Sequence, residues 1–383
     1  MRTAVGTFGG SLKDVPLSSL AETVIRAVLE RSRVPAENIG HVVMGNVIPT
    51  EPKDAYLGRV ASINAGIPKE TPAFNVNRLC GSGLQAIVSA AQSIMLKDVE
   101  FAIGAGAESM SRGPYLSASQ RWGSRLGNAE LLDYMLGILH DPFENLHMGI
   151  TAENVAARYH VTREMQDQLA VTSQQRAAHA IQEGRFKDQI VPVELKTRKG
   201  ISLFDTDEHV RGDTTLEALS KLKPAFKKDG VVTAGNASGI NDGAAAVLLA
   251  SGQSVKTFDL KPLARLVAYG HAGVEPAYMG IGPVPATRAA LKRAGLSPRD
   301  LGVIESNEAF AAQACAVMRE LDFDPAKVNP NGSGISLGHP VGATGAIITT
   351  KAIHELHRTQ ERYALVTMCI GGGQGIAAIF ERT

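Results

Sequence analysis

Hydrophobic and polar positions follow one pattern twice along the chain, with positions 34 and 296 starting equivalent segments 262 residues apart. Each copy begins with an amphipathic helix, predicted for residues 20–31 and 282–293 because apolar side chains recur every three or four positions. Each helix leads into a similar turn and then into an apolar stretch. The two turns are Val34-Pro-Ala-Glu-Asn-Ile-Gly40 and Leu296-Ser-Pro-Arg-Asp-Leu-Gly302.

The same offset relates two further pairs of segments. It carries Gly83 to Gly345, and Phe101-Ala-Ile to Tyr363-Ala-Leu. One gapless register over three separated segments favours an internal duplication. The alternative is that α/β proteins reuse similar helix–turn–strand sequences.

Each copy is predicted to be a βαβαβ-type unit. This pattern indicates an α/β fold with two mostly parallel, helix-covered sheets. The strands are predicted at residues 39–47 and 101–105, then 303–305 and 364–369, with helices at 82–96 and 343–356.

Residues 112–242 match neither copy and are more polar and more helical. Helices are predicted at residues 150–159 and 163–184, the second starting after Thr162. We expect three parts: residues 1–111 with 243–262, a loop domain at 112–242 that binds substrate, and residues 263–383. Asn236-Ala-Ser238 matches a glycosylation sequon, which has no meaning for a cytosolic chain.

Composition narrows the class of protein. A formal net charge of +1 without long basic blocks argues against nucleic acid or an anionic membrane as partner. No apolar run reaches the roughly 18–20 residues of a membrane span, and we expect no secretory signal at the start. Three widely separated cysteines argue for a reducing, cytoplasmic setting rather than a disulfide framework.

Cys80 follows an extended segment and opens the run Cys80-Gly-Ser-Gly83 at the start of a predicted helix. A thiol at the positive end of a helix dipole is expected to have a lowered pKa and to react as a thiolate. This favours a nucleophile. The alternative is a small buried hydrophobic residue, which is the usual role of a free cysteine.

His339 lies in a glycine-rich loop, braced by Pro340, that leads into the helix equivalent to the one after Cys80. Two helix N-termini from related halves are therefore expected to face each other across a pseudo-twofold axis. His339 is a candidate base for the Cys80 thiol. The alternative is a helix-capping or core histidine.

Cys369 and three glycines follow the last predicted long strand. The run Gly371-Gly-Gly373 leaves backbone N–H groups accessible, as in an oxyanion hole. A dinucleotide site would need Gly-x-Gly-x-x-Gly before a helix and an acidic residue about twenty positions on, and this pattern is absent. Asn307 follows another strand and is a weaker candidate for orienting water, while Cys315 is expected to be packing.

Together these residues resemble the thiolases of the biosynthetic type, acetyl-CoA C-acetyltransferases and bacterial broad-range β-ketothiolases, along essentially the whole chain. The resemblance implies the thiolase fold: two duplicated halves forming a five-layered α-β-α-β-α core with an inserted loop domain. The motifs that carry it are Asn77-Arg-Leu-Cys80-Gly-Ser-Gly83, Gly106-Ala-Glu-Ser-Met-Ser111, His147-Met-Gly149, Gly235-Asn-Ala-Ser-Gly239, Asn307-Glu-Ala-Phe310, Gly338-His-Pro340 and Cys369-Ile-Gly-Gly-Gly373.

The resemblance implies a ping-pong mechanism. Cys80, deprotonated by His339, takes the acyl group from one acyl-CoA, and Cys369 removes a proton from the methyl group of acetyl-CoA. One oxyanion hole uses His339 and a water held by Asn307; the other uses the backbone N–H groups of Cys80 and Gly371. The reaction is a reversible Claisen condensation or thiolysis of acetoacetyl-CoA and slightly longer 3-ketoacyl-CoAs, in fatty acid metabolism or polyhydroxyalkanoate biosynthesis.

The resemblance also implies how coenzyme A binds. No permanent cofactor and no metal are expected; coenzyme A and acyl-CoA are substrates, and the enzyme is expected to be a homotetramer. The acyl chain length preferred and the physiological direction stay open. The residues expected at the substrate are His147, Met148, Ser238, Ala309 and Phe310 along the pantetheine, Arg211 with Lys221 and Lys223 at the phosphates, and Leu139 at the acyl pocket.

The sequence departs from the family at its start. Family chains carry about ten more residues, forming an apolar strand ahead of Arg2-Thr3, and a missing strand exposes a sheet edge. Residues 1–6 match this strand poorly, whereas the second copy has its own at 263–269. We therefore expect the first sheet to lack an edge strand.

Other functions account for fewer of these residues. A decarboxylating ketoacyl synthase shares the fold but uses a second histidine where this chain has Asn307, and lacks Cys369. A non-catalytic acyl-CoA-binding relative is expected to have lost Cys80, His339 or Cys369, and all three are present. A nucleotide-dependent oxidoreductase lacks its glycine pattern here.

Overall fold

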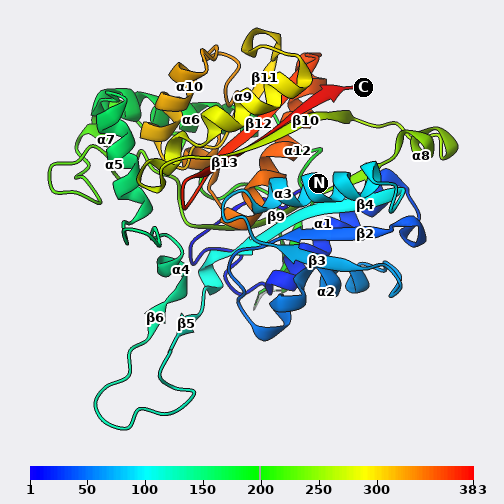
Figure 1. Cartoon of the computed structure of the whole chain (residues 1–383), viewed down its shortest axis with the longest axis horizontal. Helices are drawn as coiled ribbons and strands as arrows, with labels where there is room; N and C mark the ends of the chain where they lie inside the picture. The colour runs from blue at the N-terminus through cyan, green and yellow to red at the C-terminus, as the bar shows by residue number, and fades with distance from the viewer. Residues whose placement is uncertain (198–199) are drawn as a thin grey trace.

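The computed structural model describes residues 1–197 and 200–383, and contains two stacked halves, each built on one sheet (Figure 1). The first half has a sheet in the order β1-β9-β4-β2-β3, and the second has a sheet in the order β10-β13-β12-β11. Helices α3 and α12 lie between the two sheets, while α1 and α2 cover the outside of the first and α9 the outside of the second. The layers are therefore α-β-α-β-α, as the resemblance implied.

The elements of the halves have the following bounds. The first half contains β1 (Gly6–Thr7), α1 (Leu17–Ser32), β2 (His41–Gly45), α2 (Leu57–Asn64), β3 (Ala73–Val76), α3 (Ser82–Met95), β4 (Phe101–Ser109), β9 (Asn241–Ala250) and α8 (Gly252–Thr257). The second half contains β10 (Ala264–Gly273), α9 (Pro283–Ala294), β11 (Val303–Ser306), α10 (Ala311–Glu320), α11 (Gly334–Leu337), α12 (Val341–Thr359), β12 (Tyr363–Ile370) and β13 (Gln374–Arg382).

Between β4 and β9 the regular structure is mainly helical, and a long loop between β5 and β6 projects from the body as an arm (Figure 1). The predicted start after Thr162 is confirmed, since its hydroxyl accepts a hydrogen bond from the Met165 amide. The elements of this stretch are β5 (Tyr115–Leu116), β6 (Leu132–Asp133), α4 (Tyr134–Gly137), α5 (Met148–Arg158), α6 (Arg163–Gln182), β7 (Val193–Thr197), β8 (Gly200–Phe204) and α7 (Leu216–Ser220).

The elements of the two halves confirm the duplication and its register. An offset of 262 residues brings β2 onto β11, α3 onto α12, and β4 onto β12. It also brings the short 3-10 helix Ala36–Asn38 onto its counterpart Pro298–Asp300. The correspondence fails at β3, because the equivalent residues form α11, and so the second sheet has one strand fewer.

The prediction of mostly parallel sheets was wrong, because both sheets are mixed. β2 pairs in parallel with β3 and β4, and β11 pairs in parallel with β12, but β9 and β13 run antiparallel to their neighbours. β13 follows β12 after only three residues, and so short a connection can join only antiparallel strands. The strand β9 is the equivalent element of the first half, reached after the long insertion.

A short segment fills part of the expected gap at the edge of the first sheet, since it pairs with β9 only as far as Ala246. β1 pairs antiparallel with β9, and the amino group of Met1 and the amide of Thr3 donate hydrogen bonds to the carbonyls of Ala246 and Ala244. Residues 2–5 are buried. The guanidinium of Arg2 forms an ion pair with Asp207 in which neither side chain is exposed, with N–O distances of 2.7 and 2.9 Å.

Helices α3 and α12 approach each other through their glycines. A Cβ atom on Gly83 would lie 2.7 Å from the amide nitrogen of Ala346, and one on Gly345 would lie 2.3 Å from that of Leu84. Side chains at these positions would separate the two backbones. Because Cys80 and His339 lie just before these helices, this crossing brings the two halves of the site together, as the repeat predicted.

Candidate active site

Cys80 lies in a tight turn between β3 and α3, as predicted from its glycine-rich sequence. Leu79 adopts a left-handed conformation (φ 46°), which a residue with a Cβ adopts only when its surroundings enforce it. The Asn77 side chain accepts a hydrogen bond from the Leu79 amide at 2.9 Å, and the Ser82 hydroxyl donates to the Leu79 carbonyl at 2.7 Å. These bonds fix the turn and direct the thiol into a cavity.

The expected lowering of the Cys80 pKa was wrong. Part of the side chain faces the cavity, but the surrounding protein buries the sulfur, and this burial raises the pKa of the thiol to about 11. The backbone N–H groups of Gly371 and of Cys80 itself act in the opposite direction, and the nearby carboxyl of Glu108 adds to the increase. At neutral pH the resting group is therefore the thiol, which needs a base to react.

His339 is buried just before α12 and lines the same cavity as that thiol. Its backbone N–H donates to Oδ1 of Asn241 at 2.9 Å, and its Nδ1 lies 2.7 Å from the hydroxyl of Thr344. Gly338 has a φ of 106°, and a Cβ there would meet the Asn241 side chain. Burial lowers the pKa of His339 to about 4, so the ring is neutral at pH 7 and able to accept a proton.

Cys369 and Gly371 lie where β12 turns into β13. Gly372 and Gly373 adopt positive φ values of 77° and 83°, which let the chain reverse while the preceding N–H groups stay accessible. Burial raises the pKa of the Cys369 thiol, and the neighbouring Cys80 raises it further. A thiol of this kind is a weak acid, and its conjugate thiolate is a correspondingly strong base.

Asn307 lies behind His339, fully buried at the end of β11. Its Nδ2 atom is 3.5 Å from both ring nitrogens of His339, and its backbone carbonyl accepts a bond from the Gln313 side chain. Within residues 1–197 and 200–383, its Oδ1 atom has no hydrogen-bond partner. A buried oxygen without a partner suits a water molecule or a polar group of a substrate.

These residues line a cavity of about 240 Å³, apart from Asn307, which lies behind its wall. The cavity wall is mostly apolar. It consists of Cys80, His339, Cys369, Gly371, His147, Met148, Leu139, Ser238, Ala309, Phe310, Val47, Leu79, Met110, Leu136, Ile138, Phe226, Ala237, Gly239, Ile240, Met279 and Val341. The structure thus brings together the predicted residues of both halves and of the insertion.

His147 caps α5 and also lines the cavity. Its Nδ1 accepts a hydrogen bond from the Gly149 amide at 3.0 Å, and its ring stacks on Phe226 with centroids 4.6 Å apart. Burial lowers the pKa of His147, which favours the neutral ring. Phe226 was missed from the sequence, because a lone aromatic residue in a polar loop has no periodic signal.

Another part of the wall is formed by two segments that pair with each other. The Ser238 amide donates to the carbonyl of Ala309 at 2.9 Å, and Ala237 forms an antiparallel bridge with Phe310. Asn236, the sequon residue, is fully buried and bonds to Asp167 at 2.9 Å. Its role is therefore to anchor this wall.

The predicted phosphate-binding residues lie outside the cavity. Arg211 is exposed and its backbone N–H bonds to the Gln174 side chain, while Lys221 forms an exposed ion pair with Glu217. Lys223 is also exposed. Their contact with a nucleotide stays a prediction.

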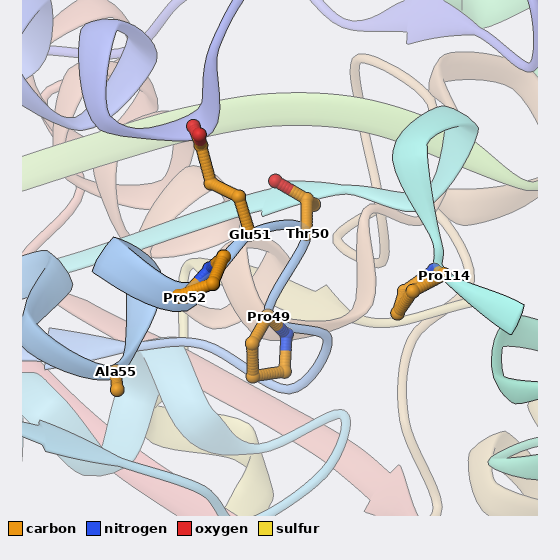
Figure 2. Close-up of a pocket in the computed structure, with 6 residues that line it drawn as sticks. All are labelled: Pro49, Thr50, Glu51, Pro52, Ala55 and Pro114. Carbon is orange, nitrogen blue, oxygen red and sulfur yellow. The ribbon is translucent and has the colours of Figure 1, made fainter. Parts of the chain in front are cut away.

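A second hollow, of about 350 Å³, shares no lining residue with the Cys80 cavity (Figure 2). Three prolines dominate its wall, and the described residues that line it include neither a cysteine nor a histidine. In the described part of the chain, no group of three His, Cys, Asp or Glu side chains is placed to hold a metal ion, and no helix could cross a membrane. The Cys80 cavity is therefore the candidate active site.

A duplicated α-β-α-β-α fold with two thiols and an imidazole in one cavity defines the class of protein, and the chain belongs to the thiolase family. Models of the thiolase N-terminal and C-terminal domains match residues 1–253 and 260–382.

Particular relatives are similar over the whole chain. The chain is 66% identical to β-ketothiolase BktB of Cupriavidus necator and 51% identical to an acetyl-CoA acetyltransferase of Pseudomonas aeruginosa, in each case over 100% of this chain and 97% of the relative. A crystal structure of human mitochondrial 3-ketoacyl-CoA thiolase in complex with CoA is 48% identical, with a TM-score of 0.97 over 100% of this chain and 96% of that one.

Proposed function

We propose that the protein is a β-ketothiolase that transfers acyl groups between acyl-CoA and acetyl-CoA by reversible Claisen condensation and thiolysis. Acetoacetyl-CoA and slightly longer 3-ketoacyl-CoAs are its substrates. The observation that carries the proposal is the meeting of Cys80, His339 and Cys369 in one largely apolar cavity. Each comes from a different element, and α3 and α12 hold the first two in place from opposite halves.

In the first half-reaction Cys80 attacks the thioester carbonyl. His339, neutral at pH 7 because burial lowers its pKa, takes the thiol proton as the carbon–sulfur bond forms. The backbone N–H groups of Cys80 and Gly371 stabilise the negative oxygen of the tetrahedral intermediate. Such a donor is worth about 3–4 kcal/mol of transition-state stabilisation. Coenzyme A then leaves as its thiol with the proton of Cys369, so that Cys369 becomes a thiolate while His339 keeps the proton of Cys80.

In the second half-reaction Cys369 removes a proton from the methyl group of acetyl-CoA. Because burial raises the pKa of its thiol, its thiolate is the stronger base of the two cysteines. The protonated His339, with a water bound to Asn307, stabilises the enolate, which attacks the acyl-Cys80 carbonyl. The bond between the acyl group and Cys80 then breaks, and the Cys80 thiolate takes its proton back from His339. Thiolysis is the reverse, with Cys369 returning the proton to the leaving enolate.

Coenzyme A is a substrate, and its pantetheine lies between His147 and Met148 on one wall and Ser238, Ala309 and Phe310 on the other. The fit is supported by the narrow apolar cavity and by the CoA complex of the related human thiolase. Arg211 meets the nucleotide phosphates beyond the mouth.

An apolar cluster next to Cys80 supports acyl groups longer than acetyl. Met110, Met135 and Val341 are buried there, with Leu139 and Ile138 packed against them. A methylene accommodated or excluded by such a wall changes specificity by about 1–3 kcal/mol. A series of kcat/KM values on 3-ketoacyl-CoAs of increasing length measures this preference.

The functional unit is a homotetramer. The arm between β5 and β6 exposes apolar side chains that a monomer leaves in water: Trp122 is 90% and Leu126 94% exposed. β3 is an edge strand with Phe74 43% exposed, which suits pairing with a second subunit. The first half consists of residues 1–111 and 243–262, and the second half of residues 263–383. Residues 112–242 act as a loop domain between them.

The catalytic thiols have to stay reduced, which suits a reducing compartment such as the cytoplasm.

An assay of acetoacetyl-CoA thiolysis with added CoA tests this function. The reaction is monitored by the loss of absorbance of the Mg²⁺-enolate of acetoacetyl-CoA. Activity is expected in the purified protein and is expected to disappear in Cys80→Ser. Equal rates for both proteins would overturn the proposal.

The role of Cys369 has a separate test. Cys369→Ala is expected to exchange acyl groups between acyl-CoA and labelled CoA through Cys80 while failing in condensation. Intact condensation in this variant would show that another group is the base.

A further inference from the structure

The hydroxyl of Thr344 lies between the ring of His339 and a backbone carbonyl. Its Oγ1 atom is 2.7 Å from Nδ1 of His339 and 2.9 Å from the carbonyl oxygen of Pro340, and the whole group is buried. Thr344 is in the first turn of α12 and does not line the Cys80 cavity. It therefore meets the imidazole on the side away from the substrate.

These two contacts determine which ring nitrogen carries the proton. A hydroxyl has one hydrogen, and a carbonyl oxygen can only accept. Both short contacts are hydrogen bonds only if Thr344 donates to Pro340 and accepts from an N–H at Nδ1 of His339. The neutral ring then carries its hydrogen at Nδ1, and Nε2 keeps its lone pair.

We propose that Thr344 is a positioning residue that fixes the tautomer and orientation of His339 so that Nε2 receives the proton of Cys80. In the transfer the Cys80 S–H bond breaks and an Nε2–H bond forms, while the Nδ1–H bond to Thr344 remains throughout. The opposite tautomer would present an N–H to the thiol and could take no proton from it. This inference rests on the proposed function of His339 as the base.

The remaining surroundings of the ring do not set the tautomer. Asn307 Nδ2 is 3.5 Å from both ring nitrogens, so it favours neither, and Asn241 bonds only to the His339 backbone. The titratable groups that share the cavity with the ring are Cys80, Cys369 and, across the cavity, His147. None of these supplies a carboxylate that could replace the hydroxyl as acceptor.

The chain contains a matched control on the same helix. Thr349 is buried and donates to the carbonyl of Gly345 at 2.7 Å, four residues back, as Thr344 does to Pro340, but no histidine contacts its hydroxyl. Thr349→Val therefore removes the same helix bond without touching His339. Thr344→Ser keeps the hydroxyl and loses only a methyl group.

The test measures alkylation of Cys80 by iodoacetamide and thiolysis kinetics from pH 5 to 9. Thr344→Val is expected to lower the alkylation rate and kcat about tenfold to hundredfold at pH 7, with the KM for CoA unchanged, since a buried donor loses its acceptor. Thr344→Ser and Thr349→Val are expected to stay within about threefold of the parent. Alkylation needs no thiolase turnover, so this series decides the inference even if the proposed activity fails.

Two outcomes would overturn the inference. Parental rates in Thr344→Val would show that another group holds the ring. An equal loss in Thr349→Val would show that the effect belongs to the helix rather than to the tautomer.

Discussion

The crossing of α3 and α12 at Gly345 provides the most direct test of how the two halves form one site. In Gly345→Ala the new Cβ would lie 2.3 Å from the amide nitrogen of Leu84 and 2.8 Å from its Cβ. Ordinary contacts begin near 3.4 Å, so the helices must separate by about 1 Å. Because the obstacle includes backbone, no rotamer change relieves the clash.

The separation has consequences for stability and for rate. Overpacking of this kind destabilises a fold by about 1–3 kcal/mol, less the gain of up to about 1 kcal/mol from replacing glycine in a helix. Cys80 and His339 precede the two helices, and a displacement of about 1 Å between reacting groups lowers the rate about 100-fold. We therefore expect kcat to fall further than stability alone explains.

Urea unfolding and thiolysis kinetics on the same preparation measure both effects. Gly252→Ala is the control, because a Cβ at this helical position meets nothing within 4 Å, and it is expected to be neutral or slightly stabilising. A Gly345→Ala protein with parental stability and kcat would refute the close crossing. A loss of kcat equal in both variants would refute the argument from geometry.

Four further predictions concern buried ionisable groups. Because burial lowers the pKa of His339 to about 4 and the neutral ring is the base, the acylation rate should stay level from pH 8 to 6 and fall only near pH 5 and below; a decline centred near pH 6.5 would contradict this. Because the pKa of His339 is lower in the folded state, the unfolded state binds a proton on this ring at a higher pH than the folded state does. The contribution of His339 to stability, measured by urea unfolding, should therefore be lost as the pH falls from about 6.5 to 4. Burial raises the pKa of Glu108 to about 8, so at pH 9 the group is a carboxylate that accepts bonds from four N–H groups, including the Gly342 amide at 2.7 Å; Glu108→Gln should lower the free energy of unfolding at pH 9 by about 2–3 kcal/mol, since an amide NH₂ would oppose one of them, and an unchanged urea midpoint would refute this. Arg2→Ala should cost about 3–5 kcal/mol because it leaves Asp207 buried without its partner, and a loss below 1 kcal/mol would show that water reaches that carboxylate.

Local chemistry in the sequence was enough to identify most of the site. The glycine-rich turns at Cys80 and His339, and the glycine run after Cys369, mark places where backbone conformation or close approach restricts the residue type. The repeat related the first two to equivalent helices. Phe226 and Thr344 escaped notice, because an isolated aromatic residue and a threonine inside a helix have many structural uses.

The sequence also misled where burial decides. A cysteine before a helix is expected to have a lowered pKa, but the surrounding cavity raises that of Cys80 to about 11. The direction of the strands was also misjudged, because an apolar run in the sequence has the same pattern whether its strand pairs in parallel or antiparallel. β9 and β13 owe their direction to how the chain enters the sheet.

The sequence by itself determined most elements of the repeat, their duplication in one register, and Cys80, His339 and Cys369 as candidates for the reactive groups, because periodicity and residue chemistry are local properties. Only the tertiary structure decided which groups share a cavity, which protons they hold and which face of His339 meets Thr344. Those properties depend on distances between segments far apart in the chain and on the removal of water around them, and neither is encoded in any one segment.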